Sequence, residues 1–358
     1  MAKLSKKNQI QNYVIRAISR NRDDVAGLAA RRFGVTRQYV NQTLRELADD
    51  GIIHSSGATR ARTYALVTVK REFALKIDSS LEEDRVWRDF VRPELGGLGD
   101  RAIEICQYGL TKMLNNVIDH SEGSRARVQV ESNPAEVTLV VVDNGIGIFC
   151  KIQRAFDLED QQHAVLELSK GKLTTDPARH TGEGIFFSSR MFDRFALLSG
   201  ALALIHFPED NDWLIEGRSK RKGTMVSMTI DPKTRRTTRS VYDKYTAGEE
   251  GDYSFNVTHI PVGLARYGEE YLVSRSQAKR VIARLNLFKR VVLDFSDVQT
   301  IGQAFADEIF RVFAQQHPEM ELVVVEAGPA VQAMIGRAQA EADGAGSGGT
   351  ASHRLTAD

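Results

Sequence analysis

Cysteine is scarce in this sequence, and long apolar runs are absent. The chain of 358 residues has two cysteines, Cys106 and Cys150, which argues against a disulfide framework or a cysteine-rich zinc site and predicts two buried thiols. No apolar run approaches the length of a membrane span. The first residues, MAKLSKKNQ, lack the apolar core of a signal peptide. We therefore expect a cytoplasmic protein with no membrane contact.

The chain also lacks a large net charge: its formal net charge is +1. The charge is nevertheless uneven. The first 70 residues hold 13 Lys and Arg against 5 Asp and Glu, a local net of +8. Such an excess in one segment points to a polyanionic partner. The length leaves room for two or three domains with real cores.

The basic first segment has the pattern of three helices followed by two short strands. Apolar residues at helical spacing predict a first helix over 10–18 and a second over 24–33. Thr36 is an N-cap candidate for a third helix that ends near Asp50. The two short strands are expected on either side of Ser56 and the residue after it.

The third predicted helix has an inner and an outer face. Val40, Leu44 and Leu47 form the face that packs inward. Four outward side chains on this helix are of types that contact base edges and phosphates: Arg37, Gln38, Asn41 and Arg45. Two further arginines, Arg60 and Arg62, are expected near the tip of the strand pair. Residues 1–68 thus resemble a winged helix-turn-helix domain, which implies double-stranded DNA as a partner. The alternative is a small basic module that contacts protein.

The first of three motifs in the middle of the chain is a predicted helix that carries Asn116. Apolar residues recur at helical spacing over 103–117, and Asn116 lies off this stripe. A carboxamide oxygen that faces a cleft can hold magnesium, which accepts few protein ligands because it keeps waters and takes substrate phosphates. Lys112 and Asp119 flank Asn116 one turn to either side.

The second and third motifs are glycine-rich turns next to regular elements. The apolar run 137–142 predicts a buried strand that stops at Asp143. An ionised carboxylate there suits the exocyclic amine of a ligand, and the glycines that follow let the backbone approach the ligand closely. In the third motif Gly182 and Gly184 stand just before a predicted helix, whose first amides attract phosphate oxygens.

In order and spacing, the three motifs resemble the N box and the two glycine boxes of the GHKL ATP-binding fold, the family of DNA gyrase B, MutL, histidine kinases and anti-sigma-factor kinases. The resemblance covers residues 69–232 and implies an α/β sandwich of the Bergerat type that binds ATP with Mg²⁺. By this resemblance Asn116 is the magnesium ligand, Asp143 contacts adenine, and Thr224 supplies the hydroxyl of the last motif. The residues expected to bind the nucleotide are Asn116, Asp119, Asp143, Gly145, Gly147, Lys170, Lys172, Thr181, Gly182, Gly184 and Thr224.

Lys112 departs from the family pattern. Many members that hydrolyse ATP carry a glutamate four residues before the asparagine, where it is the general base on water. A lysine is a poor base unless its pKa is strongly lowered, and its ammonium pairs more naturally with a phosphate oxygen. We therefore expect ATP binding with slow or absent hydrolysis, unless another carboxylate replaces the glutamate.

The stretch 149–181 separates the two glycine motifs. A long polar insertion over a nucleotide site is a lid candidate, and Lys170 and Lys172 are expected to reach the γ-phosphate when it closes. The alternative is a solvated loop whose lysines touch nothing.

We expect a multidomain α+β protein whose last third holds a linker, an α/β domain and a tail. Residues 233–252 are polar and charged, as in a linker. Within 253–339, two β-branched runs flank a helical stretch, the order of an α/β layer. The sequence RVVLDFSDVQTIGQAFADEIFRVF there resembles the central strand-loop-helix of STAS domains, in the STAS-like form found at the C-terminus of some GHKL proteins. Residues 340–358 have little apolar content and are expected to be disordered.

The preferred function is a DNA-binding regulator in which ATP and magnesium set the arrangement of domains or of a homodimer. One alternative is a serine/threonine kinase or an ATPase that acts on a protein partner. Self-phosphorylation is disfavoured, because the serines expected by resemblance near Gln303 and Ala304 are absent. The other alternative is an interaction scaffold, with a protein partner at the STAS-like domain and the nucleotide as a structural ligand.

Overall fold

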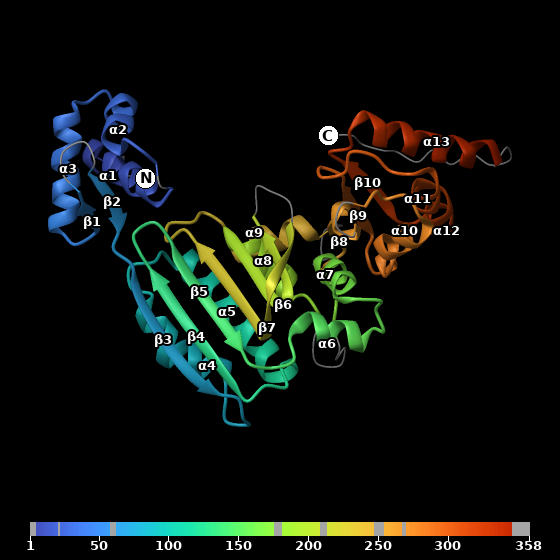
Figure 1. Ribbon diagram of the computed structural model, residues 1–358, viewed down its shortest axis with the longest axis horizontal. Coiled ribbons are helices and arrows are strands. Elements are labelled where there is room, and N and C mark those ends of the chain that lie inside the picture. The colour runs from blue at the N-terminus through green and yellow to red at the C-terminus, as the bar shows by residue number, and fades with distance from the viewer. Residues whose placement is uncertain are drawn as a thin grey trace.

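The computed structural model describes residues 5–20, 22–57, 62–174, 181–207, 213–246, 254–266 and 270–345, without the side chains of 213–220 and 342–345. It is a mixed α/β structure with three sheets. Figure 1 shows these sheets in a row, with the N-terminal helices at one end, the largest sheet in the middle and the C-terminal sheet at the other end.

The N-terminal part contains the three helices and the strand pair expected from the sequence. Asp24 and Thr36 cap the second and third helices, because their side chains accept hydrogen bonds from the backbone N–H groups of Gly27 and Tyr39. The elements are α1 (Lys6–Ser19), α2 (Val25–Phe33), α3 (Arg37–Asp49), β1 (Ile53–Ser56) and β2 (Thr63–Leu66), and β1 and β2 pair antiparallel.

The middle part is a five-stranded antiparallel sheet in the order β3-β4-β5-β7-β6. Its strands are β3 (Val69–Lys76), β4 (Arg125–Ser132), β5 (Val137–Asp143), β6 (Arg194–His206) and β7 (Trp213–Ile230). Along β5 the residues alternate between buried and half-buried, as expected for a strand with one face against a core.

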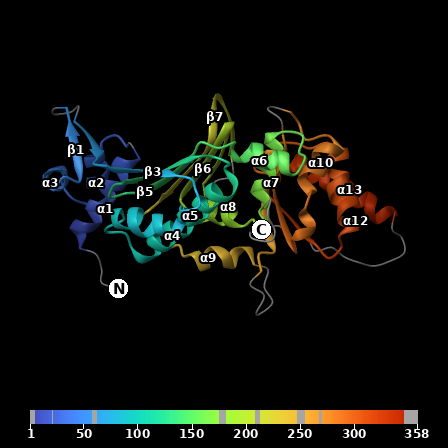
Figure 2. The same cartoon turned by 90° about the horizontal axis from the view of Figure 1, so that it is seen from below.

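Helices cover one face of this sheet, which Figure 2 shows from below. The long helix α5 (Asp100–His120) buries the apolar stripe predicted from its sequence, including Leu110, Met113 and Val117. Beside it lie α8 (Gly184–Met191) and the short α4 (Glu83–Val86), which continues as a π-helix over Trp87–Val91 and a 3-10 turn over Arg92–Glu94.

The predicted polar lid is largely helical and partly buried. It contains α6 (Ile148–Ala155) and α7 (Gln161–Lys170), and every residue of α7 from Ala164 onwards is buried. The alternative of a solvated loop is therefore wrong for 149–170. The described residues of the lid pack into the protein, because α7 belongs to an apolar cluster that continues from the middle sheet into the C-terminal sheet.

The segment predicted as a linker, 233–252, also contains regular structure. Its described part forms α9 (Thr238–Tyr242) and a 3-10 turn (Asp243–Tyr245), and Thr237 begins the helix with a capping box. The hydroxyl of Tyr242 donates to that of Tyr108 on α5 at 2.9 Å. The linker prediction is wrong here, because the aromatic side chains of this polar segment pack on the middle part.

The C-terminal part has a parallel sheet in the order β10-β9-β8, with strands β8 (Val257–Pro261), β9 (Arg290–Asp294) and β10 (Glu321–Val325). Its helices are α10 (Arg275–Ile282), α11 (Gln303–Asp307), α12 (Ala314–Gln316) and α13 (Pro329–Ala345), with a π-helix over Glu308–Phe313 and 3-10 turns over Val262–Ala265 and Leu285–Leu287. The alternation of strand and helix predicted from the sequence is confirmed. The prediction of disorder from residue 340 onwards is wrong for 340–345, because these residues belong to α13; residues 346–358 lie outside the described residues.

The buried apolar residues form two clusters. One belongs to the N-terminal part. The other is continuous from the middle sheet into the C-terminal sheet. An aromatic junction connects the two sheets, with Phe186 and Phe255 at a centroid distance of 4.5 Å and Phe187 and Tyr242 at 4.1 Å. Its members are Phe186, Phe187, Tyr242, Tyr245, Phe255 and Phe288.

The two cysteines differ in exposure. Cys106 is buried within α5, as predicted, whereas Cys150 on α6 is only half-buried. None of the helices in the described ranges has both the length and the apolar character needed to cross a bilayer.

Candidate functional site

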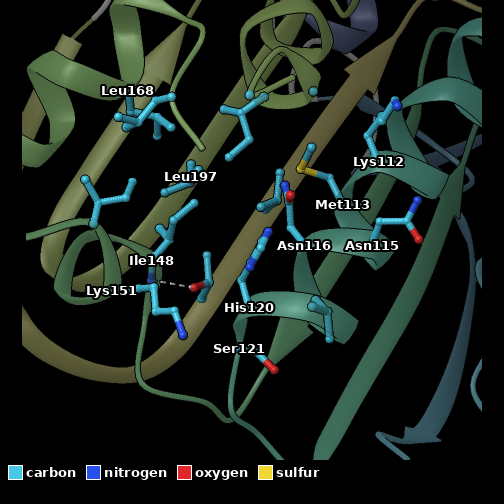
Figure 3. Close-up of a pocket in the computed structure, with 18 of the residues that line it drawn as sticks. Lys112, Met113, Asn115, Asn116, His120, Ser121, Ile148, Lys151, Leu168 and Leu197 are labelled. Carbon is cyan, nitrogen blue, oxygen red and sulfur yellow. Dashed lines mark hydrogen bonds between the residues drawn. The ribbon is translucent and has the colours of Figure 1, made fainter. Parts of the chain in front are cut away.

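A cavity of about 240 Å³ opens where α5, β5, α6 and the start of α8 meet. Figure 3 shows it with its lining side chains. Most of the residues singled out in the three sequence motifs line this cavity, although they come from elements far apart in the chain. Those that line it are Lys112, Asn116, Asp143, Gly147, Thr181, Gly182, Gly184 and Thr224.

Helix α5 forms one wall. Asn116 and His120 are one turn apart, and their side chains point into the same space (Figure 3). Asp119, which was expected to bind the nucleotide, is exposed and is not part of the lining. The off-stripe position of Asn116 therefore brings its carboxamide to the cavity, whereas Asp119 lies on the outer side of the same helix.

Asp143 stands at the end of β5 and is 6 % exposed. Burial raises the pKa of its carboxyl, while hydrogen bonds from Gly145 and Thr224 work against that rise. Oδ1 accepts from the backbone N–H of Gly145 at 2.8 Å. Gly145 itself does not line the cavity within the described residues, and its contribution is to orient Asp143.

Thr224 on β7 fixes the entry to α6. Its Oγ1 accepts from the backbone N–H of Ile148 at 3.0 Å, the dashed line in Figure 3. The preceding Gly147 has φ +86°, and a Cβ there would lie 2.4 Å from Ser199 Oγ. Both observations explain why this turn needs glycine: its backbone is left-handed and packs directly against a neighbouring strand.

The start of α8 forms the second wall. Glu183, Gly184 and Ile185 line the cavity where this helix begins. The methylene groups of Lys112 lie over the same point, since a Cβ on Gly184 would be 3.4 Å from Lys112 Cδ. A lysine side chain beside a helix N-terminus provides a positive local potential, which favours an anionic group.

The lining residues that were not recognised from the sequence include three with side chains that can carry charge: His120, Lys151 and Glu183. His120 follows Asn116 at a spacing of four, which is a usable helical signal. Lys151 lies one turn into α6 and pairs with Glu122. Glu183 lies between Gly182 and Gly184, and it brings a second carboxylate to the cavity besides Asp143.

Lys170 and Lys172 are not among the lining residues. Lys170 is fully buried, and its Nζ donates to Glu167 and to the carbonyls of Arg280 and Ala283. Lys172 Nζ donates to the carbonyl of Leu287 at 2.8 Å. Both lysines thus contact the C-terminal part. The prediction that they bind the γ-phosphate is not met in this arrangement. The physical reason is that α7 is buried in the apolar cluster shared by the middle and C-terminal parts.

The outer face of α3 is as the sequence predicted. Val40, Leu44 and Leu47 are buried, whereas the polar residues Gln38, Asn41 and Arg45 are exposed. The guanidinium of Arg37 is also exposed but forms an ion pair with Asp24, which caps the neighbouring helix. Arg62 is exposed, and Arg60 lies outside the described residues.

The described residues contain no group of three or more His, Cys, Asp and Glu side chains that could hold a metal ion among themselves. Asn116, an oxygen donor in the cavity, fits a magnesium ion that takes its other ligands from water and from a bound phosphate.

Comparison with known proteins identifies one region of the chain. No protein with a curated description matches the sequence. Residues 277–332, which comprise most of α10, β9, α11, β10 and the start of α13, match the family described as a STAS-like domain of unknown function (DUF4325). The predicted STAS-like character of the C-terminal part is therefore confirmed for these residues.

Proposed function

We propose that the chain is a nucleotide-controlled, DNA-binding regulator that holds ATP with Mg²⁺ in the cavity between α5 and α8. The observation that carries this proposal is the composition of the cavity. A buried carboxylate, Asp143, lies at one side, and a glycine-rich helix start with Lys112 lies at the other.

The residues of the cavity suit the two ends of an adenine nucleotide. Asp143 is acceptor-only when ionised, so it selects an amine such as the exocyclic group of adenine. The backbone amides at the start of α8 and the ammonium of Lys112 favour the phosphates. Asn116 lies between these groups on α5 and has the oxygen that magnesium prefers. Bound ATP would bring a phosphoanhydride bond that can be hydrolysed, and the negative charge of its phosphates.

Lys112 stabilises phosphate charge in this arrangement and does not activate water. A positively charged side chain cannot act as a general base, and it is placed beside the helix start that holds the phosphates. The proposal is therefore a binding site with slow turnover. In Lys112→Glu, phosphate release should rise by about tenfold or more if the restored carboxylate acts as a general base. Equal rates in both proteins would contradict this role for position 112.

The N-terminal part supplies the DNA-binding half of the proposal. The order of three helices and a strand pair, together with a polar exposed face on α3, suits insertion of that helix into a major groove. The local net charge of +8 favours a polyanion.

Calorimetric titration with Mg-ATP tests the nucleotide site. We expect Asp143→Asn to weaken binding by about tenfold or more, because a hydrogen bond to a charged group is lost in a buried site. Asp119→Asn is the matched control, since Asp119 lies on the outer side of α5, and its affinity should stay within about twofold. A properly folded wild-type chain that binds no Mg-ATP would overturn the proposal.

Gel-shift titration over a range of salt concentrations tests the DNA-binding half. Affinity should fall steeply as salt rises, because bound Lys and Arg release condensed counterions. Arg45→Ala should flatten this slope by about one unit if the side chain contacts a phosphate. The same titration with and without Mg-ATP tests control by the nucleotide, and identical DNA affinity and oligomer size would contradict it. A salt-independent interaction with protein would favour the scaffold alternative.

A further inference from the structure

Two helix ends from different parts of the chain meet beside the cavity, and each receives a cation from the other. Lys170, the last residue of α7, donates through Nζ to the carbonyls of Arg280 and Ala283 at the end of α10, at 2.7 and 2.9 Å. Arg284, just after α10, donates to the carbonyl of Gly171 just after α7, at 3.2 Å. The last carbonyls of a helix are partly negative and lack partners within it, so the two cations satisfy both ends.

A buried carboxylate holds the two cations in place. Glu167 is 1 % exposed, and its two oxygens accept from Lys170 at 2.5 Å and from Arg284 at 2.7 Å. Burial alone would oppose its ionisation, but the contacts with His163, Lys170 and Arg284 outweigh it and keep the pKa of Glu167 well below its usual range. The guanidinium of Arg284 is therefore fixed by an ionised partner.

The backbone at both helix ends is in a conformation that needs support from its surroundings. Arg284 has φ +62° and Lys172 has φ +51°, the left-handed region that residues with a side chain rarely adopt. Such conformations persist where neighbouring contacts impose them, and they concentrate at functional sites. The contact between these two residues is one such constraint, since the guanidinium of Arg284 donates to the carbonyl of Lys172 at 2.6 Å.

One peptide unit connects this contact to the glycine loop of the cavity. The carbonyl of Lys172 accepts from Arg284, and the N–H of Leu173 in the same peptide unit donates to the carbonyl of Gly182 at 3.3 Å. Gly182 has φ +71°, and a Cβ there would lie 2.5 Å from the Leu173 backbone. Because a peptide unit is planar and rigid, a shift at its carbonyl end moves its N–H end as well.

We infer that Arg284 is a positioning residue for the phosphate side of the cavity, acting through the 172–173 peptide unit on Gly182. Arg284 lies within the matched STAS-like residues 277–332. The inference rests on the proposed function for the identity of the ligand, and it goes further by giving the STAS-like part control over nucleotide affinity. Since coupling between sites is reciprocal, a partner that pulls Arg284 away should release the nucleotide, and a bound nucleotide should strengthen this contact.

The test compares ligands that differ only in their phosphates. In the full-length chain, Arg284→Gln should weaken binding of ATP and of ADP by about tenfold and leave adenosine within about twofold, because the adenine side at Asp143 is unchanged. Arg290→Gln is the matched control. Arg290 is an arginine of the same part, and its Nε lies 2.6 Å from Glu321 Oε2 in an ion pair that does not involve α7. The variant should leave all three affinities unchanged.

A second variant covers the case in which Arg284→Gln does not fold. Arg284→Lys keeps a cation beside Glu167 but lacks the forked donor that reaches both Glu167 and the carbonyl of Lys172. It should show the same selective loss of phosphate-dependent affinity. An equal loss for adenosine and ATP, or no loss in either variant, would overturn the inference.

Failure of the proposed function has a different signature. A wild-type chain that binds none of the three ligands contradicts the proposed nucleotide site. The inference is then decided by amide exchange in the ligand-free protein. The N–H of Leu173 should exchange about tenfold faster in Arg284→Lys than in the wild type, because Arg284 no longer holds the 172–173 peptide unit against the carbonyl of Gly182. Equal exchange rates would overturn the inference.

Discussion

The two junctions of the molecule differ in how far their charged side chains are exposed to solvent. Helix α1 contacts the middle part through partly exposed side chains, whereas α7 contacts the C-terminal part through buried ones. At the first junction Arg16 pairs with Asp231 at 2.9 Å, and the two side chains are 63 % and 34 % exposed. At the second junction the side chains of Lys170 and Glu167 are 0 % and 2 % exposed. The apolar clusters differ in the same direction. The buried residues of the N-terminal cluster all belong to that part, with the half-buried Ala135 of the middle part packed against them, whereas the other cluster is continuous across the second junction.

This difference indicates which part can move independently. An exposed ion pair contributes little to stability, so the N-terminal part can change its orientation at small cost. Separating a buried ion cluster leaves charges unpaired in the interior, so a shift of the C-terminal part against α7 has a much higher free-energy cost. A nucleotide in the cavity would therefore act first on the STAS-like side and only indirectly on the N-terminal helices.

The largest expected effect comes from the second junction. Glu167→Gln leaves the buried Lys170 and the partly buried Arg284 without their charged partner, which should lower the free energy of unfolding by about 3 to 5 kcal/mol. Urea unfolding at neutral pH measures this change. Glu321→Gln is the control, because Glu321 forms a comparable pair with Arg290 that is exposed, and it should cost no more than about 1 kcal/mol. Equal losses in the two variants would remove the distinction between the junctions.

The same carboxylate predicts a dependence on pH. Its burial favours the neutral acid, but contacts with His163, Lys170 and Arg284 outweigh burial and lower the pKa of Glu167 to about 2 from its ordinary 4.5. Because the pKa is lower in the folded state, the stabilisation is complete above 4.5 and is lost as the pH falls from 4.5 towards 2. The difference in unfolding free energy between the wild type and Glu167→Gln should therefore shrink over this range. A constant difference would show that Glu167 does not titrate in this way.

A smaller effect is expected at the segment that connects the two sheets. Tyr242→Phe keeps the ring contact with Phe187 but leaves the half-buried hydroxyl of Tyr108 without this donor, which should cost about 1 to 2 kcal/mol. Tyr271→Phe is the control, because Tyr271 is 66 % exposed. Thermal unfolding of the two variants measures the difference. If both behave as the wild type, α9 contributes no more to the joint core than a free linker would.

The smallest effect belongs to the first junction. Arg16→Ala removes the exposed pair with Asp231 and should change the free energy of unfolding by less than about 1 kcal/mol. Arg239→Ala, which removes another exposed pair with Asp243, serves as the control for loss of a surface arginine. A loss comparable with that of Glu167→Gln would mean that the N-terminal part is as firmly attached as the C-terminal part.

Local signals explain what the sequence predicted well. The cap at Thr36, the strand that stops at Asp143 and the apolar stripe of α5 all depend on neighbours within a few residues. The glycines of the cavity are also local signals, since Gly147 has a left-handed backbone that its sequence position in a turn suggested.

Long-range contacts explain what the sequence did not predict. Lys170 and Lys172 bind carbonyls more than 100 residues away along the chain, and no pattern within α7 reveals those partners. The polar composition of 233–252 predicted a linker, but the packing of this segment depends on contacts of Tyr242 and Tyr245 with residues far away in the sequence. A pair of aromatic residues three apart in an otherwise charged segment was the signal that could have indicated a helix against a core.

The unequal burial of the two cysteines has a practical consequence for measuring the cavity. Burial raises the pKa of the Cys106 thiol to about 12, so almost none of it is present as the reactive thiolate. Cys150 is partly accessible and precedes Lys151, which lines the cavity. A maleimide dye would therefore label the native chain at one place, on α6 next to a residue of the cavity wall. Its fluorescence would then report ligand entry without an engineered attachment point.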